Sequence, residues 1–232
     1  MLVGGVDEVG RGAWAGPLVV ALAVSDCRND PLSDLLRRPS RDRKDDEKLR
    51  EGQFLDSKAL PPKRRQEIAA LLPDLVLTYG IGTVSTEEID LLGLSEALAL
   101  GAQRAFSSAH VVPESVVLDG SVDYLSKRVG IEVATYPRGD TRFALVAAAS
   151  IVAKVARDAA MVALAQEVPY YGFEDNKGYP TSTHLRGLAA VGPSIHHRCS
   201  WSFGPKLLYQ NPYIAAERVG TRAVTSRSAD MV

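Results

Sequence analysis

The segment from about Thr141 to Gln166 constrains the fold most, because it has the length of a long helix and is apolar on almost every side. A helix that is apolar all round is stable only when other elements cover it. The segment is too short to span a bilayer at its longest apolar run, and charged residues interrupt it at Lys154, Arg157 and Asp158. We therefore predict a mostly buried helix inside a globular protein, and no membrane segment.

The chain opens with two apolar, β-branched runs, Leu2 to Val9 and Pro17 to Ser25, which are separated by a glycine-rich turn. This pattern predicts a hairpin of two strands. Strands are also predicted over 76–84, 116–118 and 131–136, and helices over 62–72 and 85–106, the latter with a break at Gly93. Strands followed by helices, with one opening hairpin, predict an α/β fold with a mixed β-sheet flanked by helices.

The length of 232 residues and a hydrophobic content of 46% suit one sizeable domain with a buried core and a smaller appendage. We predict a main domain over 1–168 and a C-terminal extension of helix and loops over 169–232, because the latter part lacks strand patterns. The densely charged stretch over about 28–52 indicates a surface insertion.

The two cysteines, Cys27 and Cys199, lie far apart with no metal-binding spacing, and the first residues lack the pattern of a secretory signal. We therefore expect a cytoplasmic protein. The net charge of -1 argues against binding nucleic acid by bulk electrostatics. The charge is uneven, however, since residues 170–232 hold seven Lys or Arg against four Asp or Glu. This distribution is compatible with a phosphate-backbone ligand and equally with chance.

Acidic residues stand at the ends of several predicted elements: Asp7 and Glu8 in the opening strand, Asp119 after a buried strand, and Asp140 before the long helix. Ligands of α/β sheets gather outside strand ends, and a carboxylate that ends an apolar run is costly to bury without a partner. Two divalent cations held by such carboxylates could activate a water and stabilise the leaving oxygen of a phosphodiester.

Each acid also has a simpler interpretation. Asp140 could cap the long helix, and Asp119 with Gly120 could form only a turn. Asp7 and Glu8 raise a further difficulty, because adjacent residues of a regular strand point to opposite faces. Either the backbone departs from regular geometry there, or the two acids serve the site differently.

Several motifs together resemble the type 2 ribonucleases H, the bacterial ribonuclease HII family. The first is Gly5-Val6-Asp7-Glu8-Val9-Gly10-Arg11-Gly12, and the second is Asp56-Ser57-Lys58. Leu118-Asp119-Gly120 and Gly139-Asp140 with the run 147–158 match the next two. The C-terminal part supplies Tyr171-Gly172-Phe173, Asn176-Lys177-Gly178-Tyr179-Pro180-Thr181 and Ser202-Phe203-Gly204-Pro205. The ordered matches run from residue 4 to 206.

The resemblance implies a ribonuclease H-like catalytic domain with a small C-terminal helical extension. It implies an endonuclease that hydrolyses the RNA strand of RNA/DNA hybrids and cuts 5′ of ribonucleotides in duplex DNA, leaving 3′-hydroxyl and 5′-phosphate ends, with a role in removing ribonucleotides from DNA. By position, Asp7, Glu8, Asp119 and Asp140 would be the catalytic acids that bind Mg²⁺ or Mn²⁺. Gly10, Arg11 and Gly12 would sense the ribose 2′-hydroxyl, and Tyr179 would lie against the sugar.

Other residues carry weaker signals. Lys58, Lys154, Arg142 and Lys177 could contact phosphates, although each is equally compatible with a plain surface charge. His184, His196 and His197 lack cysteine partners at ligand spacing, so a structural role is expected. Core packing is expected for Trp14.

Two other functions remain open at this stage: a nuclease or phosphatase for DNA or small phosphate esters, and a non-catalytic module that binds hybrids. The preference between Mg²⁺ and Mn²⁺ and between long hybrids and single ribonucleotides is also open. So are the roles of the segment over about 28–52 and of the chain after 206, and any protein partner. A monomer is the expected state.

Overall fold

The computed structural model describes residues 1–26, 28, 57 and 60–201. Apart from Arg28, the predicted charged insertion over about 28–52 lies outside the described residues, as does the chain after 206. No helix of the described residues is long and apolar enough to cross a membrane.

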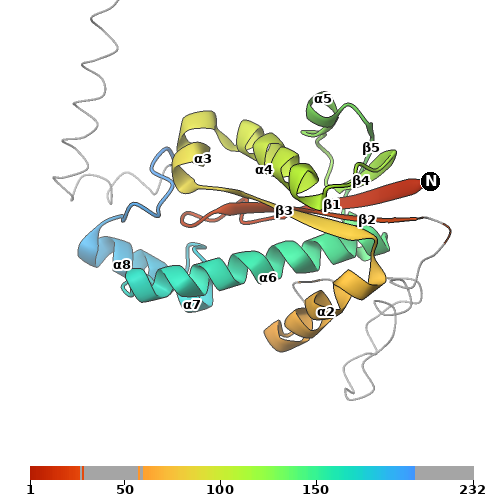
Figure 1. The fold of residues 1–232 in the computed structure, drawn as a ribbon. Coiled ribbons are helices and arrows are strands. Elements are labelled where there is room, and N and C mark those ends of the chain that lie inside the picture. The colour runs from red at the N-terminus through yellow and green to blue at the C-terminus, as the bar shows by residue number, and fades with distance from the viewer. Residues whose placement is uncertain (27, 29–56, 58–59, 202–232) are drawn as a thin grey trace, which may run out of the picture.

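A five-stranded mixed sheet in the order β3-β2-β1-β4-β5 forms the centre of the molecule (Figure 1). The predicted opening hairpin is confirmed, because β1 and β2 pair antiparallel, with Leu2 opposite Asp26 and Val9 opposite Val19. β4 pairs parallel to β1, and β5 pairs parallel to β4. The strands are β1 (Leu2–Val9), β2 (Leu18–Asp26), β3 (Thr78–Val84), β4 (Ser115–Asp119) and β5 (Glu132–Tyr136).

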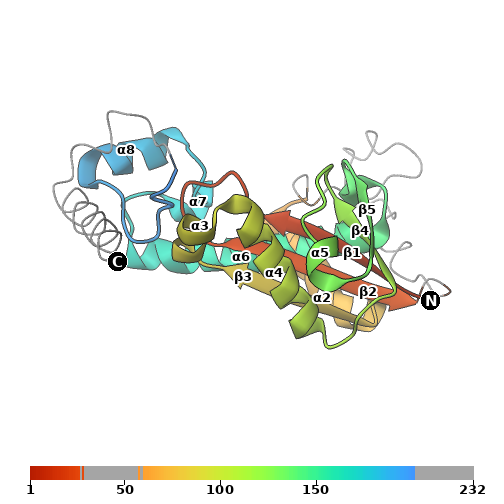
Figure 2. The ribbon, with the colours of Figure 1, turned by 90° about the horizontal axis from the view of Figure 1, so that it is seen from above.

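Helices cover both faces of this sheet, as the α/β prediction requires (Figures 1 and 2). On one face lies α6 (Ala144–Glu167), with α2 (Pro62–Leu75) packed against it. On the other face lies α4 (Leu94–Ala109), joined by α3 (Thr86–Leu92) and α5 (Ser126–Val129). The first seven residues of β2 are buried, because this strand has helices on both of its faces. The short α5 was not predicted from the sequence.

The long helix begins later than the sequence predicts. Gly139–Thr141 forms a 3₁₀ turn, η2, and α6 starts only at Ala144 after an extended Phe143. Burial also differs from the prediction of an almost fully covered helix. The helix is covered as far as Ala153, but towards its C-terminal end Val162 is exposed while Met161 is buried. The second half of α6 therefore presents one face to the protein and another to solvent.

The connection between α3 and α4 follows the predicted signals. Ser85 caps α3 in a capping box with Glu88. Gly93 ends α3 and precedes α4 with a φ of 77°, a conformation that glycine adopts without strain. The predicted break at Gly93 is therefore confirmed.

The described part of the C-terminal segment lies at the far end of α6. It contains α7 (Phe173–Asn176) and α8 (Ser182–Val191) (Figure 2). A buried cluster joins them to α6 and to the β1–β2 loop, residues 10–17; its members are Ala15, Met161, Ala165, Tyr171, Phe173 and Leu188. The predicted division of the chain at residue 168 stays a prediction.

Close approach of helix to strand depends on glycines in the sheet. A Cβ added to Gly82 of β3 would lie 1.8 Å from the carbonyl oxygen of Gly101 in α4. Contacts this short force backbone to move, because neither group belongs to a flexible side chain.

We therefore expect Gly82→Ala to lower the free energy of unfolding by about 3 kcal/mol, since α4 and β3 must separate to admit a methyl group. Urea unfolding followed by circular dichroism measures this. The exposed neighbour Thr83 provides the control, because Thr83→Ala should cost about 1 kcal/mol or less. Equal losses in the two variants would contradict the packing argument.

Candidate active site

Parallel pairing of β1 with β4 brings two of the predicted acids together. Val6 pairs with Leu118, and the next residue of each strand is an aspartate, Asp7 in β1 and Asp119 in β4. Neighbours in a parallel pair share a face, so these two carboxylates lie side by side at the same end of the sheet. Asp7 is only 6% exposed, so its charge is poorly solvated.

The third acid, Asp140, is tied to the same place by a backbone hydrogen bond. The amide of Gly139 donates to Oδ1 of Asp119 at 2.6 Å, and Asp140 follows directly in the buried η2 turn. Asp140 does not cap the long helix, because the residue at the N-cap of α6 is Phe143. Gly120, with a φ of 103°, bends the chain directly after β4.

Glu8 points to the other face of the sheet. Pairing of β1 with β2 stays regular through Val9, so the alternation of side chains is kept. The Asp7 side is the side of α6, while Val6 and Val20, which flank Glu8, belong to the core under α4. Asp7 and Glu8 therefore occupy different faces of one regular strand.

Protein side chains engage Glu8 in this arrangement. The hydroxyl of Tyr124 donates to Oε2 of Glu8 at 3.1 Å, and Nη1 of Arg11 lies 3.6 Å from Oε1. Burial raises the pKa of Tyr124, and the charge of Glu8 raises it further, so the phenol stays protonated as a donor. The sequence carries no signal for Tyr124, because this residue lies in an irregular segment without a motif.

The environment of Asp7 disfavours its charged form. Burial raises its pKa above the ordinary value, and the charges of Glu8 and Asp119 raise it further, whereas the hydroxyl of Ser150 lowers it. Ser150, on α6, shares a buried hydrogen bond of 2.7 Å with the hydroxyl of Ser57. Ser57 and Ser150, which come from two separate motifs, thus form a hydrogen-bonded pair next to Asp7.

This donor set suits a hard divalent cation. A positive ion would relieve the repulsion that raises the pKa of Asp7, and oxygen ligands are those that Mg²⁺ and Mn²⁺ prefer. In their present positions, however, no three Asp, Glu, His or Cys side chains among the described residues could hold a metal ion together.

The predicted sugar-sensing turn follows β1 directly. Its ends are joined by a hydrogen bond from the Ala13 amide to the carbonyl of Gly10, at 3.2 Å. Gly10 has a φ of 96°, and a Cβ there would lie 2.2 Å from Nε of Arg157, so only glycine fits. A Cβ at Gly12 would lie 3.9 Å from the ring of Tyr179, so the structure brings Gly12 and Tyr179 together.

The three lysines predicted to contact phosphate differ in their surroundings. Lys58 lies outside the described residues. The Lys177 side chain donates to the carbonyl of Glu174, and Lys177 itself precedes Tyr179 by two residues. Lys154 pairs with Asp158 at 2.5 Å and is mostly buried.

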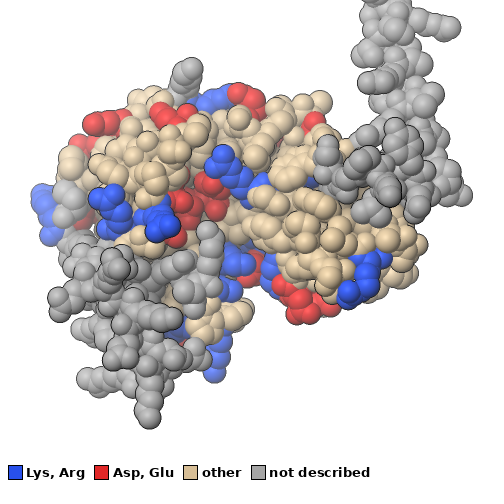
Figure 3. Space-filling model, turned by 180° about the vertical axis from the view of Figure 1, so that it is seen from behind, with Lys and Arg blue, Asp and Glu red and all other residues tan. Residues whose placement is uncertain are grey.

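Arg142 lies over the ring of Tyr136 at 5.4 Å from its centroid. Basic side chains flank a group of acidic side chains on the face seen in Figure 3.

His184 and His197 have the structural role that the sequence predicts. The Ser194 amide donates to Nδ1 of His197, so Nε2 of that ring carries the proton. His197 then donates to Nε2 of His184 at 3.0 Å, and His184 donates from Nδ1 to the carbonyl of Tyr179 at 3.0 Å. Both rings are neutral in this chain of bonds.

Trp14 packs at the edge of His184, as expected of a core residue. Trp14 is partly buried against the cluster at the C-terminal end of α6 that joins α7 and α8 to this helix.

Comparisons with known proteins agree on one family. The family model for Ribonuclease HII matches residues 40–203. A ribonuclease HII from Streptomyces coelicolor is 41% identical over 202 residues, which cover 87% of this chain and 77% of that protein. One from Thermus thermophilus is 37% identical over 198 residues, covering 85% of each. The crystal structure of ribonuclease H2 from Pyrococcus horikoshii superposes with a TM-score of 0.72 at 28% identity, covering 90% of this chain and 97% of that one.

We expect Asp7→Asn to stabilise the protein at neutral pH when divalent cations are absent. A raised pKa means that the folded chain holds the proton of Asp7 more tightly than the unfolded chain, so folding weakens as the pH rises above the ordinary aspartate range. The neutral amide removes this cost and should raise the thermal midpoint by a few degrees. Calorimetry in a chelator at pH 7, with the exposed-site variant Asp74→Asn as control, measures the change.

Adding Mg²⁺ should raise the midpoint of the unchanged chain more than that of Asp7→Asn, because a cation that binds the folded state stabilises it. A midpoint that falls in Asp7→Asn, or an equal response of both chains to Mg²⁺, would contradict the assignment.

The histidine pair should make stability depend on pH. Burial, together with the neighbouring His184, lowers the pKa of His197 to about 3. The unfolded chain therefore takes up a proton near pH 6.5 that the folded chain refuses, and stability is lost as the pH falls below that value. From pH 7 to pH 5 this loss is about 2 kcal/mol for His197.

We expect His197→Asn to be less stable at pH 7 but to lose less stability than the unchanged chain on going to pH 5. Urea unfolding at both pH values measures this. His110→Asn is the control, because His110 is exposed and its left-handed backbone suits asparagine. Parallel pH profiles of His197→Asn and the unchanged chain would refute the assignment.

Proposed function

The chain belongs to the ribonuclease HII family, and we propose that it hydrolyses the phosphodiester on the 5′ side of a ribonucleotide, both in RNA/DNA hybrids and in duplex DNA with embedded ribonucleotides. Family membership identifies the enzyme as a ribonuclease H, a metal-dependent endonuclease. The proposed products are a 3′-hydroxyl and a 5′-phosphate, and the proposed role is removal of ribonucleotides from DNA.

One observation carries this proposal: strand β1 holds Asp7 of the acidic group and leads directly into the turn beside Tyr179. Asp7 is the sixth residue of β1, and the Gly10-Arg11-Gly12 turn begins directly after the strand ends. A phosphate held by the acids and a sugar that rests against Gly12 and Tyr179 could therefore belong to one bound strand. Such an arrangement lets the ribose be recognised next to the bond that is cut.

Asp7, Asp119 and Asp140, joined by Glu8, would hold Mg²⁺ or Mn²⁺. When bound, two such ions supply charge neutralisation at the phosphate and an activated water. The proximity of Asp7 to Asp119 supports these two ligands on one face of the sheet, while Glu8 points to the other face, where Tyr124 donates to it and Arg11 lies nearby.

Discrimination between RNA and DNA would come from the turn. A backbone N–H of the turn can donate to a 2′-hydroxyl, and that bond is lost when the sugar is deoxyribose. The ring of Tyr179, 37% exposed, offers an apolar surface to the sugar. Recognition through backbone and sugar explains how a chain of net charge -1 could select its substrate without a strongly basic surface.

Several finer points stay predictions: the monomeric state, the cytoplasmic location, the choice between the two cations, and any contact of Lys58 or Lys177 with phosphate.

Asp119→Asn should lower Mg²⁺-dependent cleavage of a DNA duplex with one embedded ribonucleotide by at least about a hundredfold, because it removes a charge from the group that holds the cation. Gel analysis of matched duplexes carrying zero, one or four ribonucleotides measures both rate and cleavage position. Asp74→Asn, an exposed acid on α2, should leave the rate unchanged. Full activity of Asp119→Asn would sink the mechanism, and equal cleavage of the all-DNA duplex would favour a general nuclease.

A further inference from the structure

Two arginines are completely buried beside the β1–β2 loop. Arg157, on α6, and Arg198, in the segment after α8, are both 0% exposed. Neither forms an ion pair with a carboxylate of the described residues. Burying a charge without a counter-charge is costly, so residues of this kind are rare unless hydrogen bonds satisfy them.

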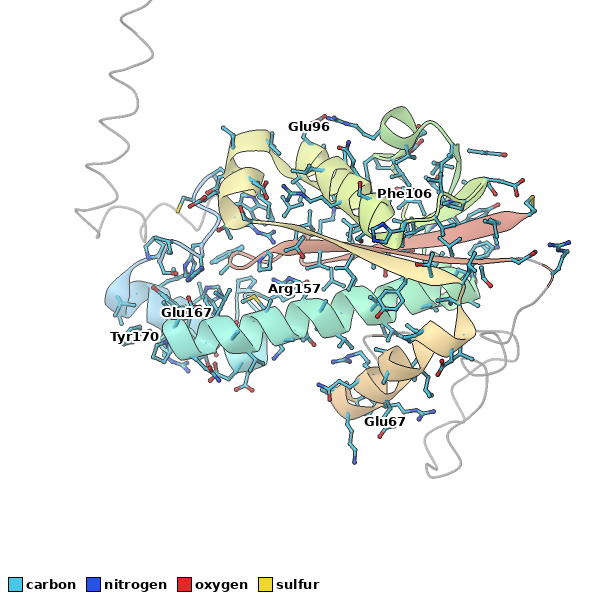
Figure 4. The ribbon with its side chains drawn as sticks, in the orientation of Figure 1. Glu67, Glu96, Phe106, Arg157, Glu167 and Tyr170 are labelled. Carbon is cyan, nitrogen blue, oxygen red and sulfur yellow. The ribbon has the colours of Figure 1, made fainter. Side chains whose placement is uncertain are left out.

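Backbone carbonyls take the place of carboxylates around Arg157. Its Nε donates to Pro17 at 2.8 Å, its Nη1 to Lys177 at 2.9 Å, and its Nη2 to Ala15 at 3.2 Å. The side chain lies between α6 and the strands (Figure 4). Arg157 thereby joins the β1–β2 loop to the segment that carries Tyr179.

Arg198 approaches the same loop and binds two of its carbonyls. Nη1 donates to Arg11 at 3.1 Å and Nη2 to Gly16 at 3.1 Å. The backbone amide of Arg198 also donates to the carbonyl of Trp14 at 2.8 Å. One residue thus holds the beginning, middle and end of the β1–β2 loop.

The bond to Arg11 determines which way the next amide points. A trans peptide directs its C=O and its N–H to opposite sides, and no peptide bond of the described residues is cis. With the carbonyl of Arg11 directed inward to Arg198, the N–H of Gly12 is directed outward. Gly12 is exposed there and lies beside the ring of Tyr179.

We propose that Arg198 is a specificity-determining positioning residue. By holding the carbonyl of Arg11 inside the protein, it keeps the Gly12 amide in the orientation that donates to the 2′-hydroxyl of a ribonucleotide. Arg198 touches no substrate and acts only through the turn. This inference rests on the proposed function, since it assumes that the turn recognises ribose.

The chemistry of the side chain explains why arginine stands at this position. A planar guanidinium can donate in two fixed directions at once, whereas the ammonium of lysine is a compact point charge. Arg198 uses one nitrogen for each of two carbonyls that are five residues apart in sequence. Lysine would keep the charge but could not hold both carbonyls with the same geometry.

Binding measured without turnover tests this role. In an Asp119→Asn background, we would measure the affinity for two duplexes of equal sequence, one all DNA and one with a single ribonucleotide. Arg198→Lys should reduce the preference for the ribonucleotide about three- to tenfold, the worth of one hydrogen bond. Affinity for the all-DNA duplex should change less than twofold, and amide exchange of residues 11–16 should quicken.

Arg104→Lys is the matched control, because Arg104 also donates to a backbone carbonyl, that of Thr83, but lies on α4. It should leave the preference unchanged. If Arg198→Lys does not fold, Arg198→Gln removes the buried charge and is measured in the same way.

An unchanged preference in a folded Arg198 variant, or an equal loss of affinity for both duplexes, would overturn the inference. Absence of any preference in the Asp119→Asn parent would instead refute the proposed recognition of ribose.

Discussion

Parallel pairing of β1 with β4 is the constraint on which the site depends. It sets Val6 opposite Leu118, so that the residues that follow them, Asp7 and Asp119, lie side by side on one face of the sheet. The Gly139 amide donates a hydrogen bond to Asp119, and this bond holds the η2 turn with Asp140 beside Asp119. Helix α6 can cover this face closely because β1 has a glycine, Gly5, under the backbone of Leu145. The acids are therefore gathered by backbone pairing, while their charges oppose the gathering.

The second half of the proposed site depends on contacts between distant parts of the chain. The β1–β2 loop is fixed by Arg157 and Arg198, and the histidine pair holds the carbonyl of Tyr179 from the opposite side. Buried hydrogen bonds, and not apolar packing alone, hold the β1–β2 loop and Tyr179 in place. Because the Nη1 and Nη2 atoms of both arginines donate to defined carbonyls, the conformation of the loop is specified more narrowly than a hydrophobic contact would allow.

Sequence patterns predicted the hairpin, the mixed sheet and the position of Asp119 at the end of a strand, because alternation and strand-end acids are local signals. Asp7 lies two residues before the end of β1, and Asp140 lies in the η2 turn ahead of α6. The difficulty with adjacent Asp7 and Glu8 was also visible, and the structure resolves it by placing them on opposite faces. Tyr124 and the hydroxyl pair of Ser57 and Ser150 were not foreseen as parts of the site. Their roles arise from tertiary contacts, which no local pattern encodes.

The distance in sequence between Arg198 and Arg11 has a consequence for synthesis of the protein. A chain emerging from the ribosome contains the hairpin and all four acids long before residue 198 exists, and domains fold as their residues become available. Until then the carbonyls of residues 11 and 16 have no guanidinium between them. The nascent protein thus acquires its acidic residues first, and the β1–β2 loop gains the support of Arg198 only after residue 198 has been added.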